Sequence, residues 1–89
     1  MAFVSGMVVI SSAGHDGGGW FVVTGADERY VYIADGKERK LGSPKRKNPR
    51  HIRKTEITLD ISGMTDRGLR RALNALKKQS ITEESEKLV

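Results

Sequence analysis

Three short runs of β-branched and aromatic residues, each followed by a turn, dominate the first 36 residues of the chain. The runs cover residues 7–11, 20–24 and 30–34, and residues 14–19 between the first two include four glycines. Val, Ile, Tyr and Phe favour strands, and each run has the length of a strand rather than of a helix. Closely spaced short strands joined by glycine turns predict a small, strongly bent, mainly β fold of the barrel type.

The residues after the third run predict a hairpin and then an irregular basic stretch. Asp35-Gly36 indicates a hairpin turn, because glycine tolerates the positive φ of a type I′ turn. We expect a short fourth strand over residues 39–41 and a last strand over residues 51–54. Residues 42–50 contain both prolines of the chain, which lack a backbone N–H and restrain the preceding residue. We therefore expect this segment, called the basic arm below, to be irregular and exposed.

The pattern changes to a helical period near the C-terminus. Leu69, Leu73 and Leu76 recur at i, i+4 and i+7, which predicts an amphipathic α-helix over residues 66–79. Thr65 is the expected N-cap, because its hydroxyl can accept a hydrogen bond from a free N–H of the first turn. The leucine stripe should pack on the barrel or on a partner, with Leu73 at its centre and largely buried.

The chain is long enough for one small domain with an appended helix. We expect the barrel over residues 1–57, the helix region over residues 58–80 and a flexible tail over residues 81–89. No run approaches the ~20 apolar residues that span a bilayer, and no basic segment followed by an apolar one opens the chain. We therefore expect no membrane association and no secretory signal, and we assign the chain to the cytoplasm.

Basic residues concentrate in two segments, although the net charge is only +5. Residues 37–54 contain nine Lys and Arg against one Glu, and residues 65–79 contain five against one Asp. A solvated surface explains most charge runs, but nine basic residues within eighteen indicate a polyanionic partner. Lys and Arg bind phosphates by releasing counterions, and Arg adds a planar, bidentate fork. These electrostatics fit RNA and DNA equally.

Enzymatic chemistry and metal binding have little support in the sequence. The absence of Cys removes disulfides, thiolate catalysis and Cys-based zinc sites. His15 adjoins Asp16, but adjacent side chains on a turn point apart, and no nucleophile stands at a known catalytic spacing. His15 and His51 are not clustered as metal ligands are. We expect a protein that is not an enzyme and uses no metal or cofactor.

The aromatic residues could serve either of two purposes. Tyr30 and Tyr32 are two residues apart, so they share one face of a strand and could stack unpaired bases. Trp20 could stack on a base in the same way. In so small a core, packing against the sheet or the helix is the better expectation for all three rings.

Five stretches of the chain together carry a family resemblance: residues 6–9, 13–23, 33–37, 39–41 and 44–48. They resemble the KOW motif, which consists of a strand, a glycine-centred loop and a second strand in an SH3-like barrel. The similarity extends over about residues 5–76 and is closest to the bacterial KOW-domain RNA-binding proteins, relatives of an archaeal and eukaryotic large-ribosomal-subunit protein. The resemblance implies a small SH3-like barrel with a C-terminal helix, and it selects RNA, in particular structured ribosomal RNA, as the partner.

By this resemblance Gly18 is the central glycine of the motif. The family has basic residues around it, whereas this chain has Gly17 and Gly19. Contact between this loop and RNA would then use backbone N–H groups and His15. A tight turn without a ligand is the alternative reading of the loop, since neither a P-loop sequence nor a helix follows it.

We therefore expect a non-catalytic, ribosome-associated RNA-binding protein, with the basic arm as its main phosphate contact and the helix as a second one. The alternative is a protein-interaction module, an accessory factor of transcription or translation that docks through the barrel and the leucine stripe; ribosomal proteins are further candidate partners. The predicted RNA-binding residues are His15, Gly18, Lys37, Arg39, Lys40, Lys45, Arg46, Lys47, Arg50, Arg53, Arg67, Arg70 and Arg71.

Overall fold

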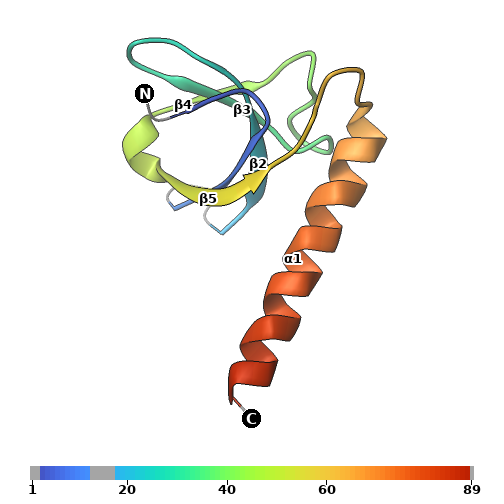
Figure 1. Ribbon diagram of the computed structural model, residues 1–89. Coiled ribbons are helices and arrows are strands. Elements are labelled where there is room, and N and C mark those ends of the chain that lie inside the picture. Colours follow the sequence, from blue (N-terminus) through green and yellow to red (C-terminus); the bar gives the residue numbers. More distant parts are fainter. Residues whose placement is uncertain (1–2, 13–17, 89) are drawn as a thin grey trace.

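A computed structural model of the chain describes residues 3–12 and 18–88 (Figure 1). Within these residues the fold is mainly β, as predicted, with one helix at the C-terminal end. The elements in chain order are β1 (Met7–Ser11), β2 (Trp20–Ala26), β3 (Val31–Ala34), β4 (Lys45–Lys47), the single-turn 3-10 helix η2 (Pro49–His51), β5 (Ile52–Thr58) and α1 (Asp66–Leu88).

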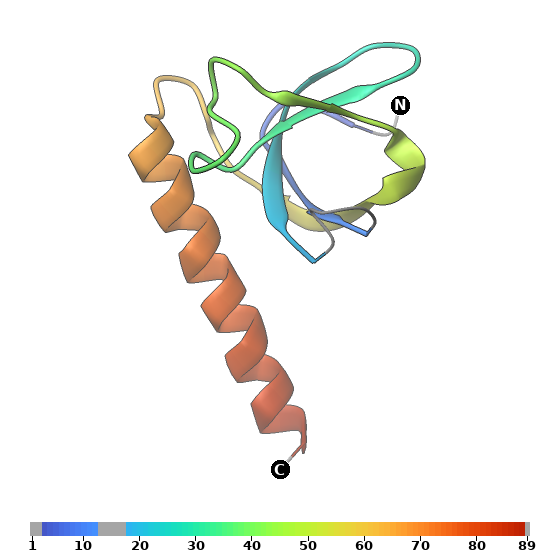
Figure 2. The same cartoon turned by 180° about the vertical axis from the view of Figure 1, so that it is seen from behind.

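The five strands form one antiparallel sheet in the order β4-β3-β2-β1-β5. The sheet curls strongly, as both views show (Figures 1 and 2). Irregularities in register accompany this bending, one between Met7 and Val9 on β1 and one between Val23 and Gly25 on β2. Bulges of this kind increase the local twist of a strand.

The sheet is not closed into a barrel, so the predicted closure is wrong. Its edge strands β4 and β5 are not hydrogen-bonded neighbours within the part of the chain that the structure describes. The turn η2 connects them along the chain, and two of its backbone N–H groups bond back to Asn48. The Asn48 side chain accepts a hydrogen bond from the N–H of Arg50, and the Asn48 carbonyl accepts one from the N–H of His51. Pro49 has no N–H to donate.

Both faces of the sheet are buried, each against a different core. Consecutive side chains on a strand point to opposite faces, so Val8 and Val9 on β1 enter different cores. The core on the concave side of the curled sheet consists of Val9, Phe21, Val23, Val31, Ile33 and Ile52. The core beneath the helix consists of Val8, Val22, Ala34, Leu69 and Leu73. Burial on both faces explains why the strands read as continuous apolar runs rather than as alternating patterns.

Helix α1 begins where the sequence predicts. The Thr65 hydroxyl accepts a hydrogen bond from the N–H of Gly68 at 3.0 Å, which is the geometry of an N-cap. Leu73 is 4% exposed and packs on the sheet, so its predicted burial is confirmed. The predicted end at Gln79 is wrong, because α1 continues to Leu88. Residues 80–88 contain no Gly or Pro to stop the helix, and this end projects away from the sheet (Figures 1 and 2).

The connection between β3 and β4 also differs from the prediction. The two strands are antiparallel, as expected, but residues 35–44 join them in place of a two-residue turn. The expected strand over residues 39–41 is absent, and the fourth strand is Lys45–Lys47. The basic arm is therefore not irregular throughout. Residues 45–47 form a strand although all three are basic. The aliphatic stem of a lysine can pack as apolar surface while its charge stays in water, so a basic sequence does not exclude a packed strand.

Candidate nucleic-acid interface

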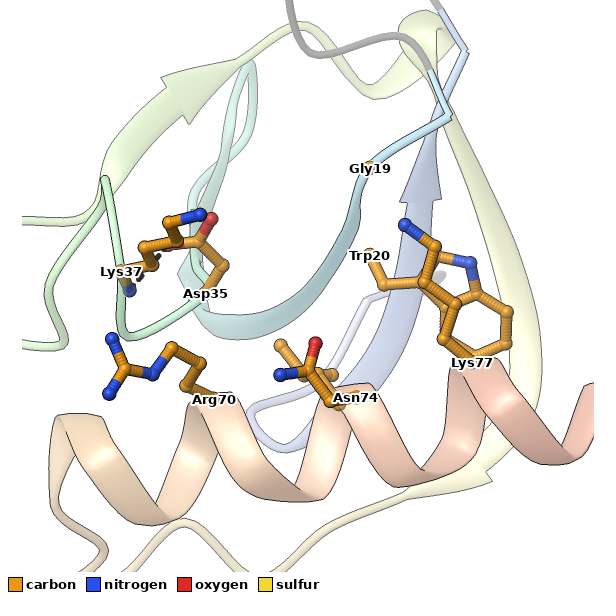
Figure 3. Close-up of a pocket in the computed structure, with 8 residues that line it drawn as sticks. Gly19, Trp20, Asp35, Lys37, Arg70, Asn74 and Lys77 are labelled. Atoms are coloured by element: carbon orange, nitrogen blue, oxygen red, sulfur yellow. Dashed lines mark hydrogen bonds between the residues drawn. The ribbon is translucent and has the colours of Figure 1, made fainter.

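A pocket of about 200 Å³ lies between the loop that follows β3, the start of β2 and the N-terminal half of α1 (Figure 3). We call it the junction pocket. Lys37 and Asp35 come from the loop, and Gly19 and Trp20 from the β2 end. The helix contributes Arg70, Leu73, Asn74 and Lys77. The junction pocket therefore joins side chains from the two basic segments of the sequence.

Local hydrogen bonds give the loop wall of the junction pocket its shape. The carboxylate of Asp35 accepts hydrogen bonds from the N–H groups of Lys37 and Arg39, both at 2.9 Å. The carbonyl of Arg39 in turn accepts from the N–H groups of Asp35 and Gly36. Gly36 has φ +78°, a conformation that glycine adopts without steric cost. The loop is thus a closed turn that presents the exposed side chain of Lys37.

The loop is fastened to the helix at two points. The carboxylate of Asp66, at the start of α1, accepts a hydrogen bond from the N–H of Leu41 at 2.6 Å. A β-carbon on Gly36 would collide with the carbonyl oxygen of Asp66, so the two backbones meet too closely for a larger residue. These contacts fix the distance between the loop wall and the helix wall of the pocket.

The helix wall follows from residue spacing. Arg70, Asn74 and Lys77 stand at i, i+4 and i+7 and share one helical face. Leu73 lies beside this face, is 4% exposed and forms part of the pocket floor. Its burial against the sheet determines the rotation of the helix. That rotation turns Arg70 and Lys77 toward the loop and β2.

The junction pocket has cations at both ends and an aromatic ring at one of them. In Figure 3, Lys37 and Arg70 lie at one end, Trp20 and Lys77 lie at the other, and Asn74 lies between them. The pocket holds three cations and one carboxylate. That carboxylate, Asp35, already accepts two hydrogen bonds from its own loop. The arrangement can attract an anion and offers an aromatic surface beside it.

A second pocket, of about 380 Å³, lies at the tip of the β2–β3 hairpin and is called the hairpin-tip pocket. It is lined by Asp27, Glu28, Arg29, Tyr30, Tyr32 and Arg46. Tyr30 and Tyr32 share this surface and belong to neither core, so the packing role expected for them is wrong. The guanidinium of Arg46 lies over the Tyr30 ring, 4.5 Å from its centroid.

Asp27 organises the hairpin-tip pocket. Its carboxylate accepts hydrogen bonds from the N–H of Tyr30 at 2.7 Å, the N–H of Arg29 at 2.9 Å and the hydroxyl of Tyr32 at 2.8 Å. These bonds stabilise the ionised form, the bond from Tyr30 most, and lower the pKa of Asp27. The hydrogen bond that the Tyr32 hydroxyl donates to Asp27 raises the pKa of that hydroxyl. The Asp27 carboxylate and the Tyr32 hydroxyl of this pocket are therefore hydrogen-bonded to each other.

The remaining predicted RNA contacts differ in exposure. Lys47 is 8% exposed, so it is not part of an exposed arm as expected, and Lys45 is partly buried. Gly18 is exposed with φ +83°, and its N–H donates to the carbonyl of Ser11 at the base of the loop. His15 lies outside the described residues. The predicted contacts that are exposed and lie outside both pockets are Arg39, Lys40, Arg50, Arg53, Arg67 and Arg71.

The predicted contacts leave out Lys77, Asn74 and Trp20, three side chains that line the junction pocket. Lys77 and Asn74 were not among the predicted contacts, although their i+7 and i+4 spacing from Arg70 places them on its face. Trp20 was expected to pack, and it does pack beside the core beneath the helix. It lines the pocket as well. Nothing in the sequence shows which of its sides stays open.

The described residues contain no group of three or more His, Asp or Glu that could hold a metal ion. Within the same part of the chain, no helix is both long and apolar enough to cross a membrane. The chain matches no protein-family model and no curated protein significantly.

Proposed function

We propose that this protein is a non-catalytic RNA-binding protein whose principal RNA contact is the junction pocket. The observation behind this proposal is the meeting of Lys37 from one basic segment with Arg70 and Lys77 from the other in a single pocket. Two segments that are separate in sequence thus supply positive charge to one concave surface. Such a surface raises the local concentration of a polyanion and speeds its binding.

The chemistry of the three cations suits a phosphate backbone. Each phosphate that Lys37, Arg70 or Lys77 neutralises releases counterions, which favours binding at low salt. Arg70 can bind two phosphate oxygens at once through its planar guanidinium. Asn74 adds an amide that both donates and accepts hydrogen bonds. A pocket of this composition can bind a phosphate backbone, and such binding requires no catalytic group.

The choice of RNA, and of ribosomal RNA in particular, rests on the resemblance to KOW-domain proteins. The bent antiparallel sheet, with a glycine-rich connection between β1 and β2, supports an open relative of the SH3-like barrel. A cytoplasmic, ribosome-associated role accords with the same resemblance. Two cationic walls held at a fixed distance could also bridge neighbouring RNA segments, as structural ribosomal proteins do.

The protein-docking alternative has less support. It requires the leucine stripe of α1 to be available to a partner. Leu69 is fully buried and Leu73 is 4% exposed, both within the core beneath the helix. The stripe therefore covers the protein's own sheet.

A salt titration with two charge-matched variants tests the proposal. Arg70→Ala/Lys77→Ala removes two positive charges from the junction pocket, and Arg29→Ala/Arg46→Ala removes two from the hairpin-tip pocket. Each phosphate contact contributes roughly −0.7 to −0.9 to the slope of log K against log salt. The first variant should therefore flatten the slope by about 1–2 units, while the control stays near the wild type.

Binding should be measured by fluorescence anisotropy with a labelled RNA stem-loop and with the DNA of the same sequence. The wild type should bind the RNA more tightly than the DNA, with an affinity that falls as salt increases. Salt-insensitive binding, or none, would refute the RNA-binding proposal. Equal losses in the two double variants would show that only net charge matters and that the junction pocket is not the contact.

A further inference from the structure

We infer that the junction pocket holds one unpaired nucleotide, with its base on Trp20 and its phosphate on Lys37 and Arg70. The protein would then select single-stranded or bulged RNA over an uninterrupted duplex. This inference rests on the proposed RNA-binding function and adds to it the form of RNA that is recognised.

The size of the pocket limits what can enter it. Its volume of about 200 Å³ lies below the roughly 300–1,000 Å³ of sites that enclose drug-sized ligands. A single base fits such a space, whereas a base pair within a helix does not. In an A-form duplex the base faces are stacked and the major groove is too narrow for side chains. A base reaches a recessed ring only after it has left the stack.

The two ends of the pocket match the two ends of a nucleotide. At one end, Lys37 and Arg70 outnumber the single carboxylate of Asp35 and provide positive charge for a phosphate (Figure 3). At the other end, Trp20 provides an aromatic surface beside Lys77. Asn74 lies between the two ends, where the ribose of such a nucleotide would lie, and its amide can bond to a ribose hydroxyl. Leu73 adds a small apolar area to the lining of the pocket, and the apolar face of a base can contact this area.

Trp20 is held in place before any ligand arrives. It is the first residue of β2, pairs with Ile10 on β1 and packs beside the core beneath the helix. It remains partly exposed and lines the pocket. A ring already fixed by packing loses little conformational freedom when a base stacks on it. Base–aromatic stacking tolerates any base, because every base has a π-face.

The hairpin-tip pocket is a poorer stacking site although it has two tyrosines. Arg46 already lies over the Tyr30 ring, and the Tyr32 hydroxyl is bonded to Asp27. The two carboxylates of this pocket, Asp27 and Glu28, balance its two cations, whereas the junction pocket has three cations against one carboxylate, so a phosphate is attracted less strongly to the hairpin tip. Stacking there would have to displace interactions that the protein makes by itself.

Trp20 is also the probe that tests this inference, because it is the only tryptophan in the chain. We would titrate the wild type with an eight-nucleotide oligoadenylate and with a blunt-ended RNA duplex of eight base pairs, and follow Trp emission. Stacking of a base on the indole should quench the emission with oligoadenylate and not with the duplex. Oligoadenylate should also bind at least tenfold more tightly than the duplex.

Two variants separate stacking from charge. Trp20→Leu should weaken oligoadenylate binding about 5- to 100-fold, the range expected for one stacked base, whereas Trp20→Phe should retain most of the affinity. Lys37→Ala alters an exposed side chain on the loop, so it leaves the fold intact. It should weaken binding and reduce the salt slope by about 0.7, while quenching at saturation persists.

The outcomes distinguish this inference from the proposed function. Salt-dependent binding of oligoadenylate with unchanged Trp20 emission would refute the nucleotide inference and leave RNA binding standing. Duplex binding as tight as oligoadenylate binding would refute it as well. Failure of the wild type to bind oligoadenylate, the duplex or the stem-loop would refute the proposed function itself.

Discussion

The junction pocket and the hairpin-tip pocket contain the same types of residue but use them differently. Each combines aromatic rings with basic and acidic side chains. At the hairpin tip two cations face two carboxylates, Arg46 lies over Tyr30, and Asp27 accepts three hydrogen bonds. At the junction three cations face one carboxylate, which is already occupied by its own loop. The first pocket stabilises the hairpin, and the second has charge left for a ligand.

This difference shows that the density of basic residues along a sequence does not indicate which positive charges the fold leaves unbalanced. Arg46 lies within the most basic stretch of the chain, yet it contacts a neighbouring tyrosine. Lys77 lies in a less basic stretch, yet it faces the more positive pocket. What matters is whether a charge is balanced by neighbours from elsewhere in the chain.

The largest expected effect comes from Leu73→Ala, which removes the floor of the junction pocket and leaves the hairpin tip unchanged. Leu73 is 4% exposed in the core beneath the helix. The substitution should lower the free energy of unfolding by about 2–4 kcal/mol, because it removes buried methyl groups and leaves a cavity. Urea denaturation would measure this loss. A loss below about 1 kcal/mol would show that the helix is not anchored to the sheet as described.

A pair of glycine substitutions compares Gly36, where the loop meets the helix, with Gly18, where a β-carbon would meet open space. Gly36 and Gly18 both have positive φ, but only Gly36 lacks room for a β-carbon. Gly18→Ala should cost about 1–2 kcal/mol for its left-handed backbone alone. Gly36→Ala should cost more and weaken RNA binding, because the loop must separate from Asp66. Thermal melts and RNA titrations of both variants would test this; equal losses of stability would contradict the close approach.

Strand β4 offers a comparison between neighbouring cations. Lys47 is 8% exposed, whereas Arg46 is exposed and lies over Tyr30. Lys47→Ala should lower the free energy of unfolding by about 1–2 kcal/mol through its lost stem packing. Arg46→Ala should lower it by about 0.5–1 kcal/mol, the value of an exposed cation–π contact. Urea denaturation of the two variants would rank them, and a larger effect of Arg46→Ala would reverse the assignment of the buried side chain.

The smallest expected effect concerns the pH dependence of the hairpin tip. Hydrogen bonds lower the pKa of Asp27 in the folded state, so its ionised form stabilises the fold above the unfolded pKa of about 3.9. This stabilisation is lost as the pH falls through the lower, folded pKa. The wild type should therefore melt at a higher temperature than Asp27→Asn at pH 7, with the difference shrinking toward pH 2. A difference that stays constant between these pH values would contradict the role of the charge.

The sequence predicted the elements whose causes are local. The valine pairs in β1 and β2, the leucine spacing of α1 and the Thr65 cap all act within a few residues, and the structure places each where it was expected. The predictions that were wrong depended on more distant partners. Closure of the sheet would require its edge strands β4 and β5 to pair, and in the described part of the chain they do not. Lys45–Lys47 forms a strand because β3 pairs with it.

The candidate site also has features that the sequence predicts and features that depend on distant contacts. The sequence by itself identified two basic segments and included Lys37 and Arg70 among the predicted contacts. Only the tertiary structure brought these two side chains to one pocket, added Lys77 and Trp20, and set Arg46 apart. The physical reason is the docking of the loop on the helix, where Gly36 meets the backbone of Asp66 and the Leu41 N–H bonds to the Asp66 carboxylate. These contacts join residues 25 or more positions apart, a separation at which local residue patterns give no signal.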